Sequence, residues 1–167
     1  MVPAILIIGA GYFLGGVLGD LAYNKFKIGR LDVSLAGIVL GALFLTITLA
    51  TPLEKVFAFR IPLSITYFLI PQASPNIATS VNDVVLSDVR STATSVQYFL
   101  GNLGSAFAPL PAGAISEISS LEIVLLTISL SAWLITAVIL MVGIINFRHA
   151  MSMILAALEV RAAERFN

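Results

Sequence analysis

The chain has 167 residues, of which 59% are hydrophobic and 11% are charged, and its mean hydropathy is +1.03. Soluble domains carry about 45–50% apolar and about 25% charged residues, so this composition excludes a water-soluble globule and favours the bilayer as solvent. The formal net charge of zero argues against nucleic acid as a partner, and the absence of cysteine excludes disulfides, thiolate metal sites and cysteine nucleophiles.

Five charge-free stretches follow one another along the chain, and each is close to or above the roughly 20 residues that cross a bilayer as a helix. Continuous apolar runs of this length are too long for the alternating strands of a membrane β-barrel. The sequence therefore predicts an all-α membrane protein with five transmembrane helices in one bundle over residues 1–147. The predicted spans are residues 1–19, 33–53, 61–82, 91–116 and 123–147.

The orientation follows from the loops, because Lys and Arg accumulate on the cytoplasmic side of a membrane protein. Seven of the nine Lys and Arg residues lie in the first and third loops and in the tail, residues 148–167. The sequence therefore predicts a multi-pass protein of the plasma membrane with its N-terminus outside and its C-terminus in the cytoplasm. Apolar residues of the tail share one face of a helix, which leaves open an amphipathic surface helix or a frayed segment.

The first predicted span carries Gly11, Gly15 and Gly19 at intervals of four residues. Such a stripe forms a smooth surface that another helix backbone can approach closely, so these glycines are predicted to pack helices. The same run resembles a dinucleotide-binding turn, but Leu14 stands where that motif needs glycine and no βαβ context surrounds it. The second and fifth predicted spans are almost purely apolar and are predicted to be peripheral, lipid-facing helices.

The third predicted span combines prolines with polar residues. Pro62, Pro71 and Pro75 each remove a backbone hydrogen-bond donor, which predicts a kinked helix. Polar side chains at this depth are costly unless they face protein or water. They therefore indicate either hydrogen bonds between helices or the wall of a solute path, and the candidates in this span are Tyr67, Gln72 and Asn76.

A charged hinge joins the third and fourth predicted spans within the stretch from Pro75 to Glu117. We expect Arg90 to pair with Asp83 or with Asp20, and Asp83, Asp88, Arg90 and Asp20 are the candidates for a cytoplasmic latch. The fourth predicted span adds small residues for helix packing and polar residues for a solute path. These are Gly101 and Gly104 for packing, and Tyr98 and Asn102 for the path.

Two stretches resemble the major facilitator superfamily of transporters. The first stretch is similar to the loop motif between the second and third helices of each six-helix half. It matches that motif at Gly16, Leu18, Gly19, Asp20 and Lys25, and it departs from it at Leu21 and Tyr23. The second stretch resembles the eleventh helix of these transporters and looks like the spinster-type branch. The residues that carry this resemblance are 90–93 (RSTA), Gly104, Pro109 and the run 113–117 (GAISE). The resemblance implies helices eight to twelve of a twelve-helix carrier, with the ninth and twelfth facing lipid.

The function that the resemblance implies is transport of a small or amphipathic solute by alternating access, without a cofactor or a metal. Since such carriers bind solute between two halves, we expect the chain to be a fragment or to need a second polypeptide that supplies the N-terminal half. A non-transporting membrane scaffold or assembly subunit is the alternative. An intramembrane serine hydrolase would pair a serine such as Ser105 with a buried histidine. It is disfavoured, because His149, the only histidine, follows the last predicted span at the interface and not in a cavity.

Overall fold

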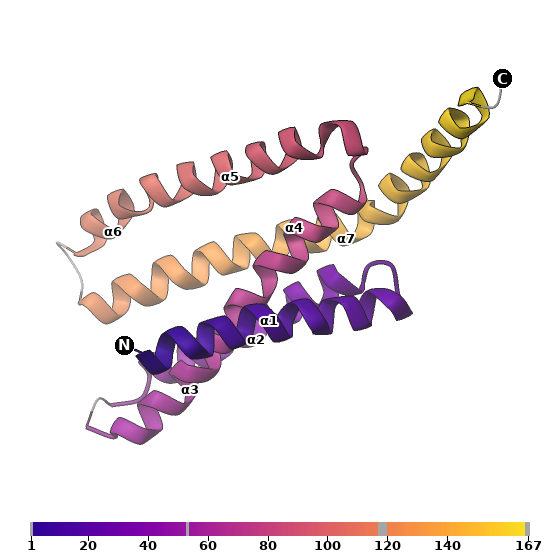
Figure 1. The fold of residues 1–167 in the computed structure, drawn as a ribbon. Coiled ribbons are helices and arrows are strands. Elements are labelled where there is room, and N and C mark those ends of the chain that lie inside the picture. The colour runs from indigo at the N-terminus through magenta and orange to yellow at the C-terminus, as the bar shows by residue number, and fades with distance from the viewer. Residues whose placement is uncertain (1, 53, 117–119, 166–167) are drawn as a thin grey trace.

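The computed structural model describes residues 2–52, 54–116 and 120–165, and within these ranges all regular structure is helical. Figure 1 shows the helices as elongated rods that run back and forth along one direction. In chain order they are α1 (Val2–Lys25), α2 (Gly29–Leu49), α3 (Val56–Leu69), the 3-10 turn η1 (Ile70–Gln72), α4 (Ala73–Asp83), the 3-10 turn η2 (Ser87–Val89), α5 (Arg90–Phe107), α6 (Pro109–Ser116) and α7 (Leu121–Arg165).

Four helical segments are long and apolar enough to cross a membrane, which confirms the prediction of an all-helical chain compatible with the bilayer. They are Val2–Lys25, Gly29–Leu49, Val56–Asp83 and Ile123–Phe147. The predicted fourth span, residues 91–116, is not among them, and it is divided between α5 and α6. The division falls at Ala108, because Pro109 has no backbone N–H to continue the hydrogen bonds of the helix, although Ala108 itself keeps helical dihedral angles.

The third spanning segment is an interrupted helix, as its prolines predict. Pro62 lies inside α3, and Pro71 lies in η1, where the backbone tightens to a 3-10 turn before α4 begins. The backbone N–H of Ala73 is shared between the carbonyl oxygens of Ile70 and Pro71 at this turn. One membrane-length element is therefore built from two helices with a defect between them.

The core of the bundle is centred on α2, which packs against α1, α3, α4 and α7. Its buried residues include Leu31 and Ile38, which join Ala73 of α4 and Leu140 of α7 in one apolar cluster. This corrects the expectation that residues 33–53 form a peripheral helix. Apolar composition alone does not separate a lipid-facing helix from a central one, and α2 has both kinds of face, because Val39, Leu40 and Leu43 are exposed.

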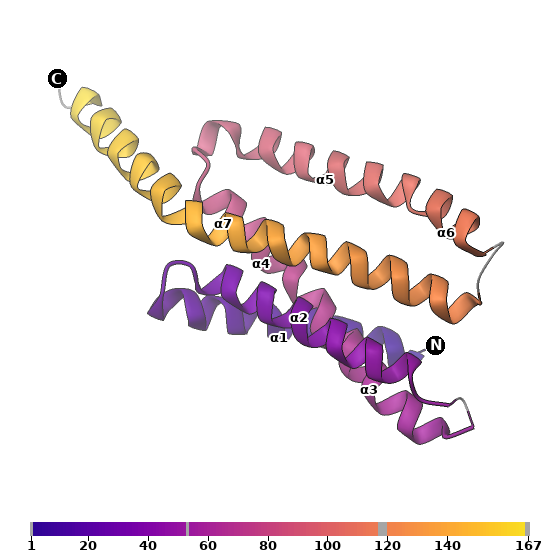
Figure 2. The same cartoon turned by 180° about the vertical axis from the view of Figure 1, so that it is seen from behind.

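The rod formed by α5 and α6, which follow one another in the same direction, lies apart from this core. No residue of α5 is buried, and the contacts of α5 are with α4, η2 and α6. Figures 1 and 2 show α7 between this rod and the pair α1–α2, so α7 separates the rod from the centre of the bundle. Most of α5 is thus left without a helix partner in the described part of the chain.

Candidate functional site

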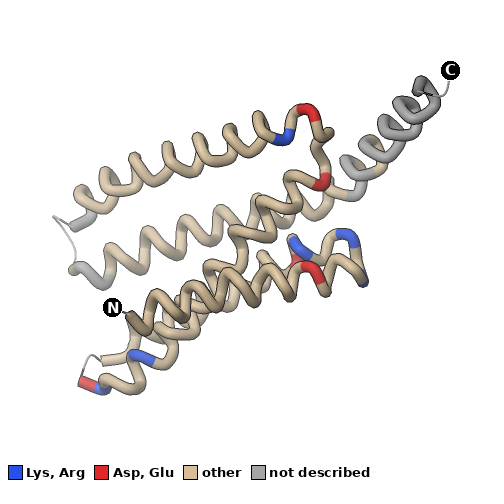
Figure 3. Tube along the Cα trace, in the orientation of Figure 1, with Lys and Arg blue, Asp and Glu red and all other residues tan. Residues whose placement is uncertain are grey.

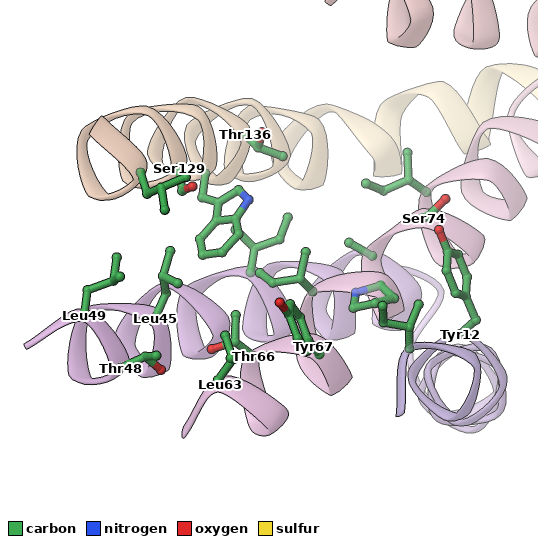
Figure 4. Close-up of a pocket in the computed structure, with 18 of the residues that line it drawn as sticks. Tyr12, Leu45, Thr48, Leu49, Leu63, Thr66, Tyr67, Ser74, Ser129 and Thr136 are labelled. Atoms are coloured by element: carbon green, nitrogen blue, oxygen red, sulfur yellow. The ribbon is translucent and has the colours of Figure 1, made fainter. Parts of the chain in front are cut away.

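A cavity of about 740 Å³ lies between α7 and the helices α1 to α4. Its walls are mainly aliphatic and aromatic, and none of the residues that line it is charged. Figure 4 shows hydroxyl groups from several helices around it, with Tyr67 central and Tyr12 and Ser74 together at one end. The polar residues of the lining are Tyr12, Thr48, Thr66, Tyr67, Ser74, Ser129, Trp133 and Thr136.

The hydroxyl groups of the cavity fall into two sets. Thr48 donates to the carbonyl oxygen of Phe44 at 2.8 Å, and Thr66 and Thr136 likewise donate to carbonyls of their own helices. These threonines therefore use their protons locally. The hydroxyls of Tyr12, Tyr67, Ser74 and Ser129 form no hydrogen bond with any described residue, so they are available to a bound molecule.

Gln72 and Asn76, two of the predicted path residues, lie in a different place. They are 4% and 2% exposed and are buried where α1 crosses η1 and α4, outside the cavity lining. Asn76 Nδ2 donates to the carbonyl oxygen of Gly15 and to that of Gln72, both at 2.9 Å. Of the two interpretations that the sequence leaves open, this geometry favours hydrogen bonding between helices for Asn76.

The glycines of α1 make this contact close enough for such a bond. Gly11, Gly15 and Gly19 are the buried residues of α1. A methyl group added at Gly15 would lie 2.6 Å from the Cα of Gln72, and one at Gly11 or Gly19 would collide with Phe68 or Asn76. The stripe therefore has its partner inside this chain, on the interrupted helix. By contrast, Gly101 and Gly104 of α5 face open space, and Tyr98 and Asn102 on the same helix are exposed and outside the cavity.

Charged residues gather at the ends of the helices. Figure 3 shows the α1–α2 turn and the α4–α5 turn at one end, and the charges that precede α3 at the other. At the first end, Arg30 binds two carboxylates: Arg30 Nη2 lies 2.8 Å from Asp20 Oδ1, and Arg30 Nη1 pairs with Asp83 Oδ2. The Arg30 guanidinium also lies 4.0 Å from the centre of the Tyr23 ring. One side chain thus connects α1, α2 and α4.

This ionic cluster differs from the predicted latch in its cation. The sequence hypothesis pairs Arg90 with Asp83 or Asp20, whereas both carboxylates are bound by Arg30, and Arg90 is exposed. Asp88 accepts a hydrogen bond from the Ser87 hydroxyl at 3.0 Å. Sequence reasoning missed Arg30 as a latch residue, although Arg30 lies in the first turn of α2, at the same end of the bundle as Asp20.

The described residues hold no group of three or more His, Asp or Glu side chains that could bind a metal ion. No protein-family model, curated protein or solved structure matches this chain. The resemblance to major facilitator carriers therefore depends on the sequence motifs alone.

Proposed function

We propose that this chain is the C-terminal part of a carrier of the major facilitator type, in the spinster-like branch, which moves a small or amphipathic solute across the plasma membrane by alternating access. The observation that supports this best is the cavity of about 740 Å³ beside the interrupted helix α3–η1–α4. Its volume is within the range of about 300–1,000 Å³ that ligand pockets occupy. Its apolar walls and free hydroxyls fit an uncharged or weakly polar molecule.

The interrupted helix gives the cavity a wall that is able to move. Residues from both sides of the break line the cavity: Thr66 and Tyr67 from α3, Ile70 from η1 and Ser74 from α4. The break at Pro71 therefore lies within the wall of the cavity. Backbone defects of this kind occur in transporters where the chain lines a cavity. A change in the angle between α3 and α4 would therefore alter the cavity directly.

The ionic cluster is compatible with the same proposal, because it ties together α1, α2 and α4 at the end of the bundle that the proposal places in the cytoplasm. The Arg30 and Asp83 side chains are 13% and 23% exposed, so their pairing is only partly screened by water. Asp20 is 65% exposed and contributes less. In the proposal, this cluster closes the cytoplasmic end of the path, with loops one and three in the cytoplasm.

The remaining part of the proposal concerns α5 and α6, which together cover the predicted fourth span, residues 91–116. Thr94, Tyr98, Asn102 and Ser105 follow one another at spacings of four, four and three residues and form one polar face. The opposite face is apolar and exposed, with Leu100 59% and Phe107 58% accessible. Polar groups facing lipid are costly, so we propose that a second half of the carrier, in the same gene or in a second polypeptide, covers the polar face.

Uptake by proteoliposomes that contain the full-length gene product, measured against a panel of solutes, tests the transport proposal. Ser129→Leu adds bulk to the cavity wall, and Ser131→Leu adds the same bulk on the exposed side of α7. We expect Ser129→Leu to reduce uptake at least tenfold and Ser131→Leu to leave it unchanged. Both variants should show wild-type helicity by circular dichroism.

Two outcomes would contradict the proposal. Equal uptake by the Ser129→Leu variant and the wild type would show that the solute does not use this cavity. No uptake of any solute by a folded full-length product would favour the alternative of a membrane scaffold or assembly subunit.

A further inference from the structure

The turn between α1 and α2 carries a compact group of cations and aromatic rings that the transport proposal does not use. Lys25 ends α1, and Phe26 and Lys27 form the tip of the turn before α2 begins. All three are exposed, and the Phe26 ring is 58% accessible. An exposed aromatic ring thus lies between two exposed lysines in a turn that joins two membrane-length helices.

Contacts with aromatic rings hold the lysines at this tip. The Lys25 ammonium lies 5.6 Å from the centre of the Phe26 ring, and the Lys27 ammonium lies 4.6 Å from the centre of the Tyr23 ring. Both distances are within the range of about 6 Å for attraction between a cation and an aromatic face. Arg30 contacts the same Tyr23 ring at 4.0 Å, so two cations share one ring. Since Arg30 is already paired with Asp20 and Asp83, Lys27 is the cation on this ring that is left for an external anion.

The carboxylates around the turn leave both lysines unpaired. Among the described residues, the carboxylates form ion pairs only with Arg30, which binds Asp20 of α1 and Asp83 of α4. Asp32, in the first turn of α2, is exposed and forms no ion pair with any described residue. Lys25 and Lys27 are thus free cations at the end of two apolar helices.

We propose that the tip formed by Lys25, Phe26 and Lys27 binds the headgroup of an anionic phospholipid. The two ammonium groups contact the phosphate, and the Phe26 ring lies among the upper acyl chains. Helices α1 and α2 are both long and apolar enough to cross the bilayer, so the turn between them lies at the level of the headgroups. This inference is independent of whether the protein transports a solute.

The aromatic ring distinguishes a lipid from a free phosphate. A soluble anion would gain only the attraction of the two lysines, which salt screens at an exposed site. A phospholipid adds burial of the apolar Phe26 side chain, of which more than half is accessible. Lipid binding should therefore survive competition by a soluble headgroup analogue.

Native mass spectrometry of the full chain in detergent, titrated with phosphatidylglycerol or with phosphatidylcholine of the same acyl chains, tests the inference. We expect tighter binding of phosphatidylglycerol. Each lysine near an anionic headgroup contributes roughly fivefold in affinity, so Lys25→Gln combined with Lys27→Gln should weaken this binding about 25-fold. The phosphatidylcholine affinity of the same variant should not change. Measurement in detergent also removes any effect of these lysines on membrane orientation.

Lys55→Gln is the matched control, because Lys55 is exposed at the opposite end of the bundle and follows Glu54 directly. The inference predicts unchanged lipid affinity for this variant and weaker binding of both lipids by Phe26→Ala. It would be overturned if the double lysine variant, with wild-type helicity, kept its affinity for phosphatidylglycerol. Displacement of the lipid by equimolar glycerol 3-phosphate would overturn it as well, since the site would then bind the free phosphate.

Discussion

The contact between the glycine face of α1 and the interrupted helix α3–η1–α4 gives the sharpest test of the packing. The critical pair is Gly19 and Asn76, because a methyl group at Gly19 would collide with the Asn76 side-chain amide. That amide is also held by its bonds to the carbonyl oxygens of Gly15 and Gln72. We therefore expect substitutions at Gly19 and Asn76 to be strongly coupled.

The magnitudes follow from these contacts. Gly19→Ala overfills a packed interface, which costs about 1–3 kcal/mol of unfolding free energy. Asn76→Ala removes a hydrogen bond between helices, worth about 0.6 and at most about 1.7 kcal/mol in membrane proteins, and leaves a small void. In the double variant the new methyl group enters the space that the amide has left. The double variant should then be more stable than the sum of the single effects predicts, by about 1 kcal/mol.

The free energies can be measured by unfolding in mixed micelles with increasing dodecyl sulfate, followed by circular dichroism. Gly16→Ala is the control, because a methyl group there meets nothing within 4 Å. Gly15→Ala should be at least as harmful as Gly19→Ala, since its methyl group would lie 2.6 Å from backbone at Gln72 that cannot rotate away. Additive effects of Gly19→Ala and Asn76→Ala, or a loss of stability in Gly16→Ala, would refute the reasoning.

Two further predictions concern the charged ends of the bundle. Arg30→Gln leaves Asp20 and Asp83 without their common cation and should cost about 1–3 kcal/mol of unfolding free energy. Asp20→Asn, at a carboxylate that is 65% exposed, should cost under about 1 kcal/mol in the same assay. Equal effects of the two variants would show that the pairing of Arg30 with Asp83 adds nothing to stability. Because the chain has no cysteine, Lys27→Cys and Lys55→Cys each introduce a single thiol. If loop one is cytoplasmic, an impermeant maleimide applied to intact cells should label the Lys55→Cys variant alone. Labelling of Lys27→Cys alone would reverse the proposed orientation.

The sequence predicts the long apolar elements well because their cause is local. Continuous apolar runs define four helical segments of membrane length, and their positions agree with the predicted spans at residues 1–19, 33–53, 61–82 and 123–147. The predicted span at residues 91–116 is less clear, because a stretch without charge is not necessarily apolar. Its polar face and Pro109 give an amphipathic helix followed by a break.

The partners of these elements could not be predicted, because they depend on how the helices cross. The spacing of Gly11, Gly15 and Gly19 predicts a close approach, but nothing in it identifies the interrupted helix as the partner. The cation of the ionic cluster was missed for the same reason. Asp20 and Arg30 are ten residues apart in the chain, and only the reversal of direction at the α1–α2 turn brings their side chains together.

The burial of Gln72 and Asn76 changes the chemistry expected of a solute path. In sequence, an amide on a membrane helix fits both a cavity wall and a contact between helices, because either place relieves the cost of exposing it to lipid. Here Asn76 uses its two donor hydrogens on backbone carbonyls of α1 and η1, and Gln72 Nε2 lies 3.4 Å from the carbonyl oxygen of Phe68. The cavity beside them is left with hydroxyl groups on apolar walls. A hydroxyl group can donate or accept a hydrogen bond but carries no charge. A solute bound in this cavity would therefore be recognised by its shape and by few hydrogen bonds. A charged solute would need a counter-charge from outside this cavity.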